Sequence, residues 1–63
     1  MVMRLNPSQL KTIEIYFKGK TEPTIIDDAQ RIMLPDDWLI IEATEETRAY
    51  RLDNIDAYYI WRT

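Results

Sequence analysis

The sequence predicts an all-β domain, and the first observation behind this prediction is an even spacing of turn signals. Residue pairs typical of turns recur every eight or nine residues, at 19–20, 27–28, 36–37, 45–46 and 53–54. The second observation is that Ile, Thr, Tyr, Leu and Trp fill the intervals, and these residues are typical of strands. The third is that the intervals are too short for helices of ordinary length. Antiparallel strands joined by short turns are therefore expected.

Strand positions follow from these turns. The six predicted strands lie at 10–18, 22–26, 29–34, 38–43, 47–52 and 57–62. The first alternates Ile13, Ile15 and Phe17 with polar residues, as a half-buried strand does. The six strands together predict a single domain over residues 1–63, built as a small antiparallel meander or an SH3-like barrel of five to six short strands.

Two segments also carry helix signals. Asp27 and Gln30 have the spacing of a capping box, so one short helical turn near 28–34 is the alternative to a strand there. Asn6-Pro7-Ser8 could begin another single turn, with Asn6 as its cap and proline at the first helical position. Neither turn would change the predicted fold class.

The fourth and fifth predicted strands form a hairpin with Glu45-Glu46 as its turn. Side chains alternate between the two faces of a strand. Ile41 then lies opposite Tyr50 on the core face, and Ile40 lies opposite Arg51 on the other face. A turn longer by one residue on each side would leave these faces unchanged.

The last predicted strand is expected to pair with residues 47–52. Tyr59 and Trp61 then fall on the core face, and both faces of the three-stranded unit are apolar. A domain of this size cannot build a full core on both faces, so one of them should contact something else. The predicted partner-binding residues on that second face are Trp38, Ile40, Arg51, Tyr58 and Ile60. The alternative is that the chain covers both faces itself. The first strand, with residues 25–26 and 32–34, would wrap around as a small barrel over one face, and strand ends or the N-terminal Met1, Val2, Met3 and Leu5 would cover part of the second.

The residues of catalysis and metal binding are scarce. The chain has no histidine or cysteine and one serine, Ser8, so the usual nucleophile and base sets are missing. We expect no catalytic residue, no cofactor and no metal site. The acidic doublets are interpreted as solvated turns, because alternate turns of a meander lie at opposite ends of the sheet.

Charge and hydropathy limit the classes of partner. The net charge is −3, and residues 21–46 carry eight carboxylates against Arg31 alone. An acidic net charge argues against nucleic acid as a partner, since neutralising phosphates is the main source of affinity for most nucleic-acid-binding proteins. No apolar run approaches the roughly 20 residues that span a bilayer, and no signal peptide is evident. We therefore expect a cytoplasmic location, with no membrane and no small-molecule substrate.

The C-terminal pattern Thr47–Ile55 (TRAYRLDNI), followed by an aromatic strand, resembles the end of many short β-rich proteins carried by prophages and mobile elements of Gram-positive bacteria. The resemblance covers only the C-terminal part of the chain. It implies a small accessory protein of a mobile element, and it assigns no functional residue.

The expected function is the binding of a protein partner, or of a second copy in a homodimer, without catalysis. One alternative is an acidic decoy, in which the carboxylates of residues 22–46 inhibit a host nucleic-acid-binding or defence protein. Another is a small-barrel nucleic-acid binder that uses Arg48, Arg51, Arg62 and the aromatic side chains.

Overall fold

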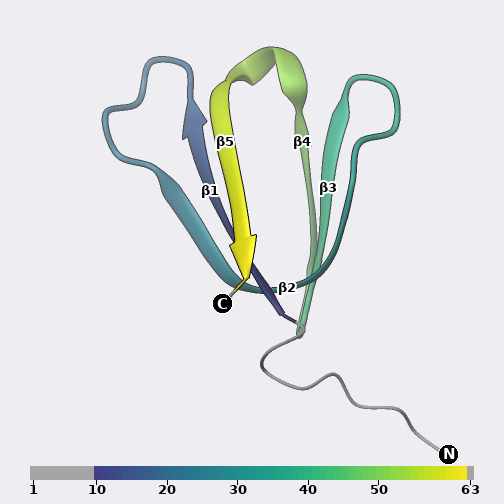
Figure 1. Ribbon diagram of the computed structural model, residues 1–63. Coiled ribbons are helices and arrows are strands. Elements are labelled where there is room, and N and C mark those ends of the chain that lie inside the picture. Colours follow the sequence, from purple (N-terminus) through teal and green to yellow (C-terminus); the bar gives the residue numbers. More distant parts are fainter. Residues whose placement is uncertain (1–9, 63) are drawn as a thin grey trace, which may run out of the picture.

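The computed structural model describes residues 10–62, and within them five antiparallel strands form one open sheet (Figure 1). The strands are β1 (Lys11–Phe17), β2 (Thr24–Met33), β3 (Trp38–Ala43), β4 (Thr47–Arg51) and β5 (Ile55–Arg62). A 3-10 turn, η2 (Leu52–Asn54), joins the last two strands. The order across the sheet is β4-β3-β2-β1-β5, so β4 and β5 are its two edges. The predicted all-β fold class is confirmed, and the sheet is open, not closed into a barrel.

β2 is one long strand where the sequence predicted two strands and a turn at Asp27-Asp28. Ala29 pairs with Lys11 of β1 on one side and with Ala43 of β3 on the other. Next to Ala29, β2 carries one residue more than each of its neighbours, and such bulges bend a strand. Figure 1 shows β2 curving around the base of the molecule. The acidic pair therefore lies at a bend, and the helical alternative for 28–34 is wrong.

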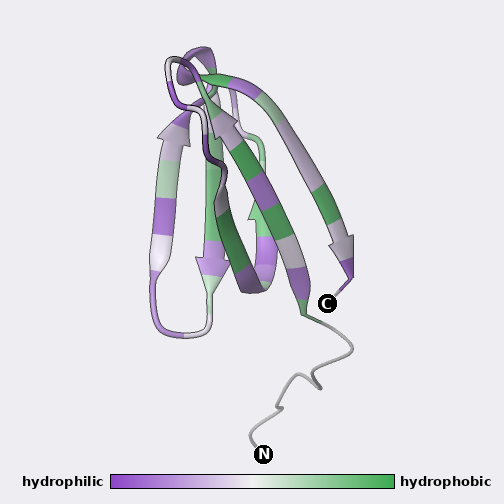
Figure 2. Cartoon of the chain, turned by 90° about the vertical axis from the view of Figure 1, so that its left-hand side faces the viewer, coloured by the Kyte–Doolittle hydropathy of each residue, from purple (hydrophilic) through white to green (hydrophobic). Residues whose placement is uncertain are grey.

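The bend in β2 folds the sheet over its own apolar side. Figure 2 shows hydrophobic residues alternating with hydrophilic ones along the strands. The fully or nearly fully buried apolar side chains are Ile13, Ile15, Ile26, Ala29, Leu39 and Ile41. The ring centroids of Phe17 in β1 and Tyr50 in β4 lie 5.0 Å apart in an edge-to-face contact, although β2 and β3 separate these two strands in the sheet. This inner face is the hydrophobic core.

β3 and β4 form the predicted hairpin with the predicted faces but in a different register. Ile41 lies opposite Arg48, where Tyr50 was expected. The Ala43 N–H donates a hydrogen bond to the Glu46 carbonyl at 2.8 Å, so the turn lies one residue earlier than predicted. The register differs by two residues, and because side chains alternate with a period of two, none of them changes face.

β5 pairs with β1 and not with β4, which corrects the prediction for the last strand. Tyr58 lies opposite Ile15 and therefore on the inner face, whereas Tyr59 lies opposite Glu14 on the outer face. The predicted faces of this strand were thus inverted. The cause is η2, which leads the chain away from β4; the Asn54 carbonyl accepts a 2.9 Å hydrogen bond from the backbone N–H that follows β1.

Two predictions concern residues outside those described: the helical turn at Asn6-Pro7-Ser8 and the cover of an apolar face by residues 1–5. In the described part of the chain, no helix is long and apolar enough to cross a membrane.

Candidate functional site

The structure divides the five predicted partner-binding residues between two faces. Trp38, Ile40 and Arg51 lie together on the outer face of the β3–β4 hairpin, where the Arg51 guanidinium carbon is 5.5 Å from the Trp38 ring centroid. Tyr58 packs against the core, and Ile60 lies opposite Ile13 on the inner face, 41% exposed at the sheet edge. The predicted surface is therefore not continuous.

A different surface carries three of the four most exposed large apolar side chains of residues 10–62. Ile25 of β2 is 59% exposed, and Tyr59 and Trp61 of β5 are 55% and 47% exposed. Glu14 of β1 lies opposite both Ile25 and Tyr59, so these three side chains form a row across three strands. We call this surface the β1–β5 outer face, and it consists of Glu14, Tyr16, Ile25, Tyr59 and Trp61.

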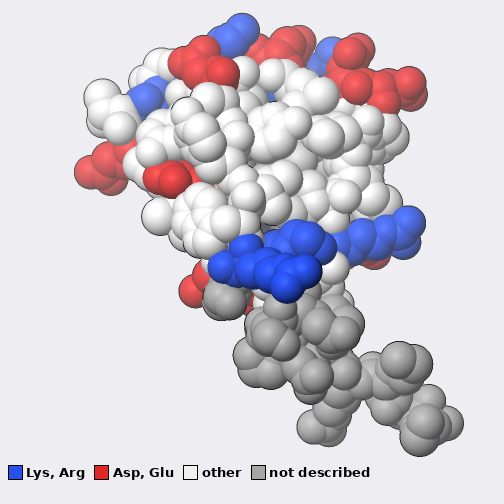
Figure 3. Space-filling model, viewed as in Figure 1, with Lys and Arg blue, Asp and Glu red and all other residues white. Residues whose placement is uncertain are grey.

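An open groove of about 710 Å³ lies on the β1–β5 outer face. Besides members of that face, Ala57, Asp56 and Lys20 line it. Figure 3 views the molecule from the side on which β5 lies: uncharged side chains cover the middle, and charged ones surround them at the upper and lower ends and along the left side. The groove is thus mainly aromatic, with carboxylates and one lysine at its margins.

Glu14 and Tyr16 hold each other in place within this groove. The Tyr16 hydroxyl donates a 2.6 Å hydrogen bond to Oε2 of Glu14, and the Tyr16 ring meets the Tyr59 ring edge-on at 6.0 Å between centroids. The hydrogen bond to Glu14, assisted by partial burial and by the negative charge of Glu14, raises the pKa of Tyr16 above its ordinary value of 10.0. The groove therefore contains a positioned carboxylate between aromatic rings.

We predict that Glu14→Gln lowers the pKa of Tyr16, because it removes the charged acceptor. Tyrosinate absorbance followed through an alkaline titration measures the change, and Tyr16→Phe identifies which part of the curve belongs to Tyr16. Since the folded-state pKa of Tyr16 is raised, its contribution to stability is present below about pH 10 and is lost as the pH rises through the folded-state pKa. Superimposable titration curves for Glu14→Gln and the unchanged protein would contradict the contact.

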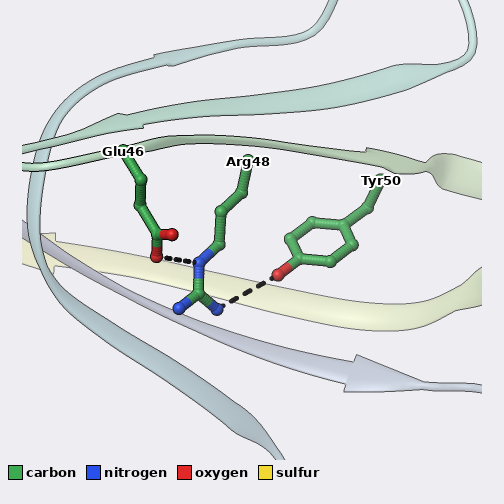
Figure 4. Close-up of polar contacts among 3 residues, drawn as sticks. All are labelled: Glu46, Arg48 and Tyr50. Carbon is green, nitrogen blue, oxygen red and sulfur yellow. Dashed lines mark hydrogen bonds and ion pairs between the residues drawn. The ribbon is translucent and has the colours of Figure 1, made fainter.

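The arginines of β4 have partners on their own strand or just beyond it. The Nε of Arg48 donates to Glu46 at 2.7 Å, and its Nη1 donates to the Tyr50 hydroxyl at 3.3 Å (Figure 4). The hydrogen bonds from Arg48 to Tyr50 and Glu46 raise the pKa of Arg48. Arg51 lies 3.5 Å from an Asp53 carboxylate oxygen. These carboxylates reduce the positive charge that β4 presents to a phosphate backbone.

The acidic doublets are distributed between the two ends of the sheet. The backbone N–H of Leu52 donates a hydrogen bond to the Asp37 carbonyl, so the doublet Asp36-Asp37 lies beside η2. The turn that precedes Glu46 lies at the opposite end of the sheet (Figure 1). Among residues 10–62, no group of three or more potential ligands could hold a metal ion. The carboxylates of residues 22–46 thus do not form one continuous surface.

No protein-family model matches this chain. No curated protein matches it. No solved structure matches it either.

Proposed function

We propose that this domain is a non-catalytic protein-binding module and that it recognises its partner through the β1–β5 outer face. The observation that supports this proposal is that three exposed large apolar side chains share one face: Ile25 of β2 lies on one side of Glu14 in β1, and Tyr59 and Trp61 of β5 lie on the other. Exposed apolar groups that gather in one place typically mark interaction sites, and Tyr and Trp are frequent binding hot spots.

The charges around the groove favour a basic and apolar partner segment. Glu14 occupies the centre of the face and Asp56 lines its margin, while the whole chain carries a net charge of −3. A lysine or arginine of the partner that pairs with Glu14 would also lie against the Tyr16 and Tyr59 rings, where cation–π attraction adds to the ion pair. An adjacent apolar side chain would fill the space next to Trp61. An accessory role in a mobile element, as the Thr47–Ile55 pattern implies, is compatible with such a module.

The chain offers a matched pair of variants for the test. Trp61 is 47% exposed on the β1–β5 outer face, and Trp38 is 39% exposed on the outer face of the hairpin. We would select binders to the immobilised domain from a displayed random-peptide library and measure their affinity by calorimetry. We expect enriched peptides with an apolar residue beside Lys or Arg, at least about tenfold weaker binding by Trp61→Ala, and unchanged binding by Trp38→Ala.

Salt provides a second measurement on the same peptides. Affinity should fall as the salt concentration rises, and Glu14→Gln should reduce this dependence because it removes the central charge. Loss of binding in Trp38→Ala with retention in Trp61→Ala would overturn the assignment of the face. Failure to select any peptide, together with a mobility shift of oligonucleotides at low salt, would favour the nucleic-acid alternative.

A further inference from the structure

The two edges of the sheet differ in length and in charge. β4 has five residues, two of which are Arg48 and Arg51, and charged side chains at an edge discourage pairing with another strand. β5 has eight residues, and the five from Ala57 to Trp61 are uncharged. Within residues 10–62, β5 pairs only with β1, so its other side is an unpaired edge. Such a long, apolar edge strand is a template for a further strand.

Side chains on both faces of β5 are exposed near its end. Tyr59 and Trp61 are exposed on the outer face, and Ile60, which alternates onto the inner face, is 41% exposed as well. If β5 only contacted a partner through one face of the sheet, exposed apolar side chains would be expected on that face alone. Exposure on both faces is expected where the neighbouring strand of the sheet is missing, because that strand would cover both sets of side chains.

The charges at the ends of β5 favour a second copy of the same strand. Asp56 lies three residues before Tyr59, and Arg62 lies three residues after it. In an antiparallel pair of β5 strands centred on Tyr59, each Asp56 is therefore next to the partner copy's Arg62. Arg62 also lies directly opposite Lys11 of β1, and within residues 10–62 neither forms an ion pair. Like charges opposite one another are unfavourable, and an incoming carboxylate would offset this repulsion.

We propose that β5 pairs with β5 of a second copy, antiparallel and centred on Tyr59, so that two five-stranded sheets become one continuous sheet with two-fold symmetry. The pairing is self-complementary, as such an interface requires. It brings the two copies' β1–β5 outer faces side by side. The proposal depends on the free edge of β5 and goes beyond the binding of a protein partner.

Cross-linking tests the pairing directly, since the chain has no cysteine of its own. Tyr59→Cys places two thiols opposite each other across the two-fold axis, and opposed positions of antiparallel strands have Cα separations that a disulfide spans. We expect this variant to become a covalent dimer under mild oxidation. Ala49→Cys, at the centre of the β4 edge, is the matched control and should remain a monomer on a non-reducing gel. Equal cross-linking of the two variants, or none of Tyr59→Cys, would overturn the proposal.

Charge exchange tests the register. Molecular mass by light scattering over a range of concentrations should show a dimer for the unchanged protein. Arg62→Asp should weaken dimerisation at least tenfold, and the double variant Asp56→Arg/Arg62→Asp should restore it, while circular dichroism confirms that each variant is folded. Arg51→Asp on β4 should leave the dimer unchanged. A protein that is monomeric at every concentration would exclude this dimer, and peptide binding by such a monomer would leave the proposed function standing.

Discussion

Leu39→Ala is expected to remove about half of the free energy that stabilises the folded domain. Leu39 is completely buried near the start of β3, opposite Tyr50 of β4. Removing such a side chain costs about 2–5 kcal/mol, because the lost transfer free energy is increased by the cavity left behind. At roughly 0.05–0.15 kcal/mol per residue, the whole domain is stabilised by only about 3–9 kcal/mol. The chain has no cysteine with which a disulfide could compensate.

Urea unfolding followed by tryptophan fluorescence measures this loss of stability. The urea concentration at the unfolding midpoint should fall, and the dependence of the unfolding free energy on urea concentration should change little. Ile25→Ala is the control, because Ile25 is an aliphatic residue of similar size that is 59% exposed. Its cost should stay within about 0.5 kcal/mol, as for most surface substitutions. Equal losses in the two variants would mean that Leu39 does not belong to the core.

Ala29→Leu is expected to destabilise the domain by about 1–3 kcal/mol, because extra methylene groups do not fit into a packed core. Ala29 is completely buried, and it lies opposite a second alanine, Ala43, beside the bulges of β2. A larger side chain there would separate the two halves of the sheet where they share β2. Both halves should therefore lose stability together, in one cooperative transition.

Thermal unfolding followed by circular dichroism measures this effect, and a domain of this size shifts by roughly 4–8 °C per kcal/mol. Ala49→Leu is the control, since Ala49 lies opposite Ile40 on the outer face of the hairpin and is exposed. Its melting temperature should stay near that of the unchanged protein. An unchanged melting temperature in Ala29→Leu would show that the bend of β2 accommodates a large residue.

The fold class and one hairpin could be predicted from the sequence because both depend on local patterns. The segment from Trp38 to Arg51 alternates apolar residues with the period of a strand, and its turn can only bring two neighbouring strands together. The predicted register was wrong by two residues. The face of every side chain in this hairpin was nevertheless correct, because an even shift preserves the alternation.

The extent of β2 and the place of β5 could not be predicted in the same way. Asp27-Asp28 has the composition of a turn, but a bulge accepts the same residues while pairing continues on both sides. At β5, η2 interrupts the two-residue period, so the alternation of β4 does not carry over to the next strand. Both outcomes depend on which strands become neighbours.

The sequence by itself determined that this chain forms short antiparallel strands and which residues of each strand share a face. Only the tertiary structure decided which strands lie next to each other, and it separated Trp38 from Tyr58 and placed Tyr59 and Trp61 beside Glu14. The physical reason is that alternation is a property of adjacent residues, whereas strand pairing minimises the free energy of the whole core. The β1–β5 outer face, which we propose binds a partner, exists because β5 pairs with β1.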